Sequence, residues 1–226
     1  MKFNPWVGHD YSSAVNIFGG RKILIVGESH YDSPENVGTC SPNYTNIVVS
    51  NYVSDKKRHS FFTNLATFLT GTGPEVSRVS TRLTWENIAF YNYVPVFVAS
   101  SARSFESKSF WELGEEAFEE VLRTLSPDLI IVLGLRLWDN TYYRHVEDRA
   151  RRFDRRDHQP KTLIDGRRID TINIDHPAST RFSARRVRGE VVENLGDVFG
   201  LDEVRYRELP DRHYPSREEG PHKEGS

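Results

Sequence analysis

Two continuous apolar runs constrain the fold of this chain more than any other feature. The runs are Ile23–Val26 and Leu129–Leu133, and neither contains a polar residue. Short strands that are apolar on both faces occur mainly in parallel sheets that are covered by helices on both sides. The sequence therefore predicts an α/β protein, specifically a three-layer α/β/α sandwich with a mostly parallel central sheet.

Helical periodicity in the segments between strands supports this alternation. The apolar spacing predicts a core helix over residues 59–69, closed by glycine, and a second helix over residues 110–125. We predict a further helix that runs from Gly134 to about residue 152, and a last one that begins after Ser183. Helices between apolar strands are what a parallel sheet needs for its crossover connections.

The remaining segments add strands and one long connection. Residues 87–91 are typical of another strand, and Asp165-Gly166 predicts a hairpin that joins residues 162–164 to residues 168–174. Residues 32–57 predict a long irregular segment with one helical turn or more, and long loops in compact domains often carry function.

Length and composition limit the class of protein. The chain of 226 residues has a formal net charge of −2, and we predict one domain over residues 1–207 and a disordered tail over residues 208–226. The single cysteine, Cys40, provides neither a disulfide framework nor a cysteine-ligated metal centre, and no HExxH spacing occurs. No apolar run approaches the roughly 18 residues of a membrane span. We expect a cytoplasmic monomer without cofactor, metal or membrane anchor.

Polar side chains follow each of three expected strands. Glu28-Ser29-His30-Tyr31 follows the first apolar run, Asn92 ends the next strand, and Asp175-His176 follows the second arm of the hairpin. The carboxyl ends of parallel strands meet at one edge of a sheet, and ligands of open α/β proteins bind there. The sequence therefore predicts one site built from these three segments.

In their order and placing, these segments resemble the motifs of the uracil-DNA glycosylase superfamily. Gly27–Tyr31 occupies the place of the family's first loop, which has forms such as G-Q-D-P-Y and G-E-A-P-G. Tyr91–Pro95 looks like the motif whose Asn reads the base, and His176–Ser179 is similar to the last motif, H-P-S-P or H-P-A. The likeness spans residues 21–190 and implies a uracil-DNA glycosylase-like fold and hydrolytic excision of a base without a cofactor.

The resemblance implies roles that also suit the chemistry of base excision. Such an enzyme flips a base out of the stack, holds its polar edge and stabilises charge as the glycosidic bond breaks. Asn92 would read the base, His176 would donate to a base oxygen, and Glu28 would position or deprotonate the attacking water or stabilise the sugar cation. The other candidates are Ser29 for catalysis and Tyr31, His30 and Tyr44 for base binding.

The segment after the last motif supplies the candidate DNA contacts. Thr180, Arg181 and Phe182 stand where the family has a loop that probes the minor groove. Arg185 and Arg186, near the start of the following helix, are expected to hold phosphates. The expected partner is therefore DNA, single- or double-stranded, in DNA repair or in antiviral defence.

Departures from the family pattern leave the substrate and two alternatives open. Ser29 stands where uracil enzymes carry Asp or Asn, and Glu28 matches a branch whose iron–sulfur cysteines this chain lacks. The base is therefore uracil or a modified pyrimidine, including the modified bases of phage DNA. One alternative is an inactive glycosylase-fold module that binds nucleic acid or protein. The other is an esterase-like hydrolase with Ser29 as nucleophile and His176 as base, which lacks the G-x-S-x-G elbow.

Overall fold

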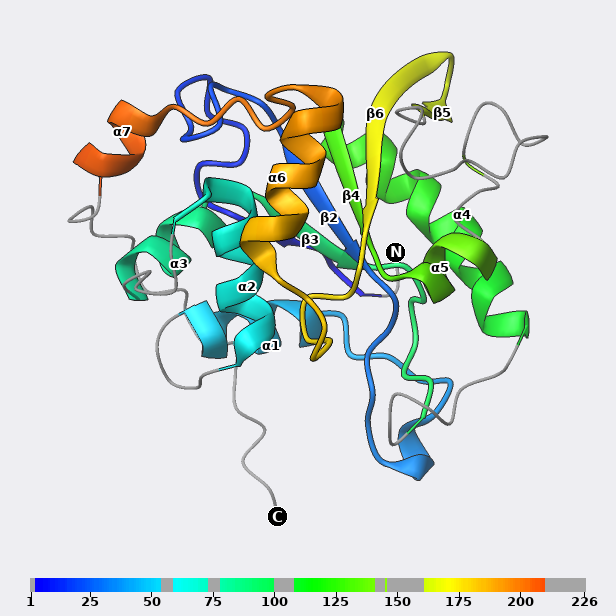
Figure 1. Cartoon of the computed structure of the whole chain (residues 1–226). Helices are drawn as coiled ribbons and strands as arrows, with labels where there is room; N and C mark the ends of the chain where they lie inside the picture. The colour runs from blue at the N-terminus through cyan, green and yellow to red at the C-terminus, as the bar shows by residue number, and fades with distance from the viewer. Residues whose placement is uncertain are drawn as a thin grey trace.

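A six-stranded sheet forms the centre of the molecule, with helices on both faces (Figure 1). The computed structural model describes residues 3–53, 59–72, 78–99, 108–140, 145 and 161–209. The strands are β1 (Trp6–Val7), β2 (Ile23–Gly27), β3 (Ala89–Asn92), β4 (Leu129–Leu133), β5 (Lys161–Ile164) and β6 (Arg167–Ile174). The predicted α/β class with a mostly parallel sheet is confirmed.

The order of the strands creates a switch point in the middle of the sheet. The order is β1-β3-β2-β4-β6-β5, in which β3, β2, β4 and β6 run parallel and the two edge strands run antiparallel. From β2 the chain turns to one side to form β3, and it then crosses back to form β4 on the other side of β2. The carboxyl ends of β2 and β4 therefore diverge into a crevice, which is where doubly wound sheets bind ligands.

The helices form one layer on each face of the sheet (Figure 1). The helical elements are η1 (Pro34–Asn36), α1 (Tyr44–Val53), α2 (Ser60–Thr70), α3 (Arg78–Trp85), α4 (Lys108–Leu125), α5 (Leu135–Asn140), α6 (Ala184–Leu195) and α7 (Glu203–Glu208). One apolar cluster joins one face of the sheet to α1, α2, α3 and α6, and a second cluster joins the other face to α4 and α5. These two clusters bury the sheet on both sides, as the all-apolar runs require.

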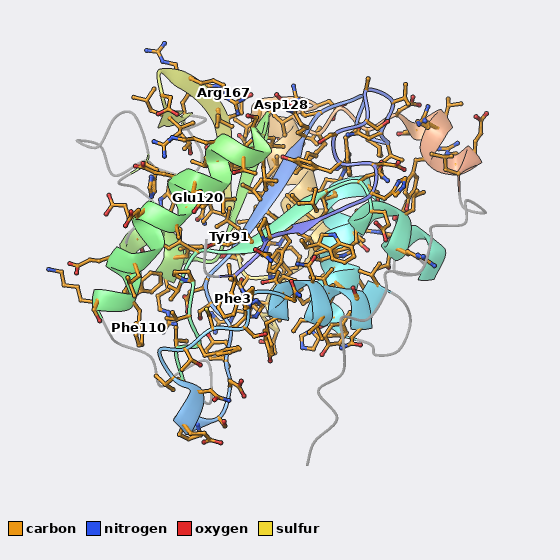
Figure 2. All side chains as sticks on the ribbon, turned by 180° about the vertical axis from the view of Figure 1, so that it is seen from behind. Phe3, Tyr91, Phe110, Glu120, Asp128 and Arg167 are labelled. Atoms are coloured by element: carbon orange, nitrogen blue, oxygen red, sulfur yellow. The ribbon has the colours of Figure 1, made fainter. Side chains whose placement is uncertain are left out.

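The alternation of side chains along β2 shows how one strand serves both layers. Ile23 and Ile25 belong to the cluster with α2, whereas Leu24 and Val26 belong to the cluster with α4, and all four are fully buried. Seen from behind, α4 covers its face of the sheet with Tyr91 beneath it (Figure 2). Full burial of one such aliphatic side chain contributes about 1.5–3 kcal/mol to the stability of the fold. The uninterrupted apolar run of β2 therefore stabilises the sheet against both helical layers.

Several predicted elements are confirmed to within a few residues. The helix predicted over residues 59–69 is α2, which Gly71 ends in the left-handed conformation with φ 73°. The helices predicted over residues 110–125 and after Ser183 are α4 and α6. The hairpin is confirmed as well, because Asp165 and Gly166 have φ 48° and φ 78°, the positive values that a two-residue hairpin turn needs.

Other segments differ from the sequence-based expectation. Residues 32–57, predicted to be mostly irregular, contain the ten-residue helix α1, and α3 was not predicted at all. In α1 only Thr45, Val49 and Val53 are buried, and a polar residue within so narrow a stripe hides the helical period. The helix after Gly134 is described as α5, and most of its predicted remainder lies outside the described residues. The predicted tail also lies outside them from residue 210, whereas Glu208 is the last residue of α7.

Candidate functional site

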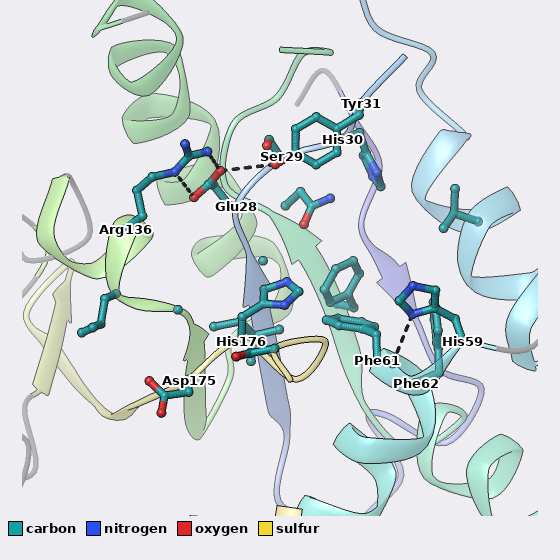
Figure 3. Close-up of a pocket in the computed structure, with 18 of the residues that line it drawn as sticks. Glu28, Ser29, His30, Tyr31, His59, Phe61, Phe62, Arg136, Asp175 and His176 are labelled. Carbon is teal, nitrogen blue, oxygen red and sulfur yellow. Dashed lines mark hydrogen bonds and ion pairs between the residues drawn. The ribbon is translucent and has the colours of Figure 1, made fainter. Parts of the chain in front are cut away.

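The largest concentration of candidate residues lines one pocket at the carboxyl edge of the sheet (Figure 3). The pocket has a volume of about 750 Å³, within the range of ligand sites in proteins. It opens where β2, β3, β4 and β6 end, at the switch point of the sheet. Its lining includes the predicted residues Glu28, Ser29, His30, Tyr31, Asn92, His176 and Arg181. The structure therefore brings the three predicted segments together.

Backbone hydrogen bonds hold the loop after β2 in place. The Tyr93 and Val94 N–H groups donate to the carbonyls of Gly27 and Glu28, and the Val98 N–H donates to the carbonyl of His30. The loop therefore runs beside the chain that follows β3 as if the parallel pairing continued. This pairing fixes the backbone that carries the polar side chains, which favours a preorganised site.

Glu28 forms an ion pair with Arg136 across the pocket wall (Figure 3). Arg136 Nε donates to Glu28 Oε2 at 2.7 Å, and Arg136 Nη2 donates to Oε1. The Glu28 side chain is only 15% exposed, so water screens the pair weakly. Desolvation raises the pKa of Tyr31, whose hydroxyl therefore stays protonated at neutral pH and donates to Glu28 Oε1 at 3.5 Å.

A backbone hydrogen bond determines which ring nitrogen of His176 carries the proton. His176 Nδ1 accepts a hydrogen bond from the Ala178 N–H at 3.2 Å, so the proton of the neutral ring resides on Nε2. Desolvation by the pocket walls lowers the pKa of His176, an effect that the Glu28 carboxylate opposes and that His59 reinforces. The ring is therefore neutral at physiological pH and presents one N–H donor.

The turn that carries His176 is tied to two elements. The Ser179 N–H donates to the His176 carbonyl at 2.8 Å, and Asn64 of α2 donates to the carbonyl of Pro177 at 2.8 Å. The ring of Phe61 lies against His176 with centroids 5.5 Å apart. The motif after β6 is thus held against α2, which places the imidazole over the aromatic side of the pocket.

Asn92 lies at the end of β3 and is 5% exposed. Its side-chain amide has no hydrogen-bond partner among the described residues, although it lines the pocket. Gly27 makes room for it, because a Cβ at position 27 would lie 2.2 Å from Asn92 Oδ1. The nitrogen and oxygen of this amide are not among the buried side-chain atoms that lack a partner, so they open onto the pocket, where a ligand or water can bond them.

Aromatic residues from α1, α2 and β3 form the opposite wall. Phe61, Phe62 and Phe90 line the pocket, together with Tyr52, which stacks on Phe62 with centroids 4.4 Å apart. His59 ends this wall at the start of α2, where its Nδ1 accepts the Phe61 N–H at 3.2 Å. One side of the pocket is therefore suited to a flat apolar group, and the other to a polar edge.

His30 and Tyr44 have neighbours on the side away from the polar groups of the pocket. His30 Nε2 is hydrogen-bonded to Thr45 Oγ1 at 2.8 Å, and its ring packs edge-on against Phe3 and Tyr44. Burial lowers the pKa of His30 to about 4. Tyr44 does not line the pocket and instead packs against Phe97. These two side chains anchor α1 and the N-terminal arm to the loop after β2.

Ser29 lines the pocket, but it forms no hydrogen bond with His176. Its hydroxyl oxygen is buried and not held by a base. Activation of a serine nucleophile requires a base within hydrogen-bonding reach, so the geometry gives no support to the esterase-like alternative.

The candidate DNA contacts separate into two groups. Arg181 is exposed and lines the pocket, and Thr180 lies exposed beside it in the turn before α6. Phe182 is half-buried and packs against the core cluster under α6. Arg185 and Arg186 are exposed in the first turns of α6, where Arg186 pairs with Glu190 at 2.6 Å. Arg181 is therefore the candidate closest to the pocket.

Sequence reasoning missed Arg136 and His59, both of which line the pocket. Arg136 follows the end of β4, so the rule that selected the other strand ends would have found it had β4 been included. His59 occupies the N-cap of α2, a place that the sequence assigned only to the start of a core helix.

Metal-binding groups and membrane spans were sought among the described residues. Within the described residues, no group of three or more His, Cys, Asp or Glu side chains is arranged to hold a metal ion. No helix in that part of the chain is both long enough and apolar enough to cross a membrane. No protein-family model matches the chain, and a search of curated proteins finds no match.

Proposed function

We propose that the protein is a monofunctional DNA glycosylase that flips a pyrimidine base into this pocket and hydrolyses its N-glycosidic bond. The observation that carries the proposal is Asn92, a residue only 5% exposed whose amide lines the pocket and has no partner among the described residues. An amide offers one acceptor and two donors, which match the alternating carbonyl and N–H groups of a pyrimidine edge.

The walls of the pocket suit the two sides of such a base. Phe61 and Phe62 provide an aromatic surface for stacking, while His176 Nε2–H is available to donate to a base oxygen. Negative charge develops on that oxygen as the bond to the sugar breaks. One donor of this kind stabilises the transition state by about 3 kcal/mol.

Glu28 supplies the charge that the sugar side of the reaction needs. A carboxylate near the anomeric carbon stabilises an oxocarbenium-like transition state and accepts a hydrogen bond from the attacking water. The chemistry requires water alone and no cofactor. Arg181 at the pocket and Arg185 in α6 are exposed and would contact DNA phosphates, with the protein acting as a monomer.

A specific observation favours one second candidate, a glycosylase-like pocket that binds without catalysis. Arg136 donates to both carboxylate oxygens of Glu28 and neutralises its charge. A partly buried carboxylate with only a structural role would be paired in the same way. This candidate predicts binding of single- or double-stranded DNA, or of a protein, without release of a base.

An abasic-site assay tests the proposal. The substrates are single- and double-stranded DNAs that contain uracil, 5-hydroxymethyluracil, hypoxanthine, alkylated bases or phage-type modified cytosines. We expect release of at least one pyrimidine. Asn92→Ala should slow that release about tenfold to a hundredfold, because an amide-like base edge loses its partners.

The matched control is Asn194→Ala, an exposed change in α6 outside the pocket, which should leave the rate unchanged. If the wild-type protein binds these DNAs but makes no abasic site in any of them, the binding candidate replaces the enzyme. Release of uracil alone would exclude modified pyrimidines as the substrate.

A further inference from the structure

We propose that Arg136 is a positioning residue that selects which lone pair of Glu28 faces the pocket. The inference rests on the proposed function and assigns a role to Arg136, a side chain with no part in the proposed base excision. Arg136 lies in the first turn of α5, directly after Gly134 (φ 89°) turns the chain away from β4. Its guanidinium reaches Glu28 from the opposite side of the switch point.

The hydrogen bonds around Glu28 leave one direction open. An ionised carboxylate has about four lone-pair positions, two on each oxygen. Arg136 occupies one position on Oε2 and one on Oε1, and the Tyr31 hydroxyl occupies the second position on Oε1. The remaining position is on Oε2, and it is the one available to a water molecule in the pocket.

This arrangement gives Glu28 a defined place in the reaction. As the bond between the sugar and the base breaks, its electron pair leaves with the base, whose oxygen accepts the His176 hydrogen bond. The water oxygen then forms the new bond to the anomeric carbon, and the proton it loses passes to the free lone pair of Glu28 and on to solvent. The departed base takes up a proton from solvent, so atoms and charge balance.

A planar guanidinium is necessary for this selection. Its two parallel N–H donors fix both oxygens and therefore the rotation of the carboxylate. A lysine ammonium retains the positive charge but acts as a point charge, so the carboxylate rotates more freely. Arg136→Lys therefore separates orientation from charge.

The surface of the molecule offers a matched control. Arg123 forms the same kind of two-pronged contact with Asp165, through Nε at 2.8 Å and Nη2 at 3.2 Å, but both residues are exposed and neither lines the pocket. Arg123→Lys thus makes the same chemical change at a pair of similar geometry where no substrate is expected.

The experiment compares Arg136→Lys, Arg123→Lys and wild type on the DNA that wild type processes best. We measure the single-turnover rate of abasic-site formation, the Kd for that DNA and the melting temperature. Arg136→Lys should slow base release roughly 10- to 100-fold, as expected for a misplaced catalytic group, with Kd within about twofold of wild type. Arg123→Lys should match wild type in all three measurements.

A double-mutant cycle keeps the test valid if Arg136→Lys also lowers stability. In a Glu28→Gln background, Arg136→Lys should slow base release no further, because the carboxylate that it positions is already gone. A full additional loss in the double variant, or a wild-type rate for Arg136→Lys, overturns the positioning role while the glycosylase activity stands. A wild type that releases no base overturns the proposed function and this role together.

Discussion

His30 and His176 follow two strands that end at the same edge of the sheet, yet the fold uses them in different ways. His176 is exposed, has one nitrogen held by a backbone N–H and lines the pocket beside Phe61. His30 is 7% exposed and bonds to Thr45 in α1. The comparison teaches that a strand end brings a residue to the edge of the sheet, but the neighbouring helix decides whether its side chain is bonded within the core or left available as a donor.

The neighbours of each ring account for the difference. Phe3 and Tyr44 pack edge-on against His30 and exclude water from it. His176 lies in an exposed turn between β6 and α6, where Phe61 contacts its ring and leaves it open to solvent. The same side chain therefore has a packing role in one place and a free N–H donor in the other.

Replacing His176 gives the largest effect that we expect from this comparison. His176→Ala removes the proposed donor to the leaving base, so the single-turnover rate of base release should fall by about 100- to 1,000-fold. The melting temperature should stay close to that of wild type, because the ring is exposed. His9→Ala, which lies outside the pocket lining, is the control and should retain the rate. An unchanged rate in His176→Ala would remove the proposed difference between the two rings.

Replacing His30 should affect stability instead of chemistry. His30→Ala leaves a cavity beside Phe3 and a buried Thr45 hydroxyl without its partner. We expect the free energy of unfolding, measured in urea, to fall by about 2–4 kcal/mol. The rate of base release per folded molecule should stay within a fewfold of wild type. A variant that is fully stable but inactive would instead make His30 a base-binding residue, as the sequence predicts.

The third and smallest effect is a dependence of stability on pH. Burial lowers the pKa of His30 to about 4, whereas the unfolded chain takes up a proton near its ordinary value of 6.5. The unfolded state therefore binds more protons between these values, so stability is complete above pH 6.5 and is lost as the pH falls toward 4. The loss amounts to at most about 3 kcal/mol.

Urea unfolding at a series of pH values measures this effect. His30→Gln retains a polar group that can reach Thr45 but does not titrate, so most of the loss below pH 6.5 should disappear in that variant. An identical pH dependence in wild type and His30→Gln would show that other groups cause it. His176 should contribute less, because its ring is more exposed.

The parts of the fold that the sequence predicts well are those with a regular apolar pattern. β2 and β4 are visible as uninterrupted apolar runs, and the hairpin is visible in Asp165-Gly166 because so few residues adopt positive φ. α1 and α3 are not visible, because the apolar residues of α1 are spread over several of its faces, with a threonine among its buried residues, and α3 has only three apolar residues in eight. Their formation depends on the surface against which they pack.

The candidate site is predictable to the same extent and for the same reason. The ends of apolar strands pointed to Glu28, Asn92 and His176, and the structure places all three around one pocket. Arg136 did not emerge, because the rule of strand ends was not applied to β4, and His59 did not, because a histidine before a helix has no local signal of function. Only their position opposite Glu28 and beside Phe61 gives them significance.

The sequence by itself determined the class of the fold, the direction of the strands and the edge of the sheet where polar groups gather. Short apolar runs separated by helices are consistent with few other arrangements. The tertiary structure alone decided that Arg136 holds Glu28, that the Asn92 amide has no partner among the described residues and that His30 bonds to Thr45 of α1. These outcomes depend on contacts between residues up to 108 positions apart, and burial of a polar group depends on every element around it.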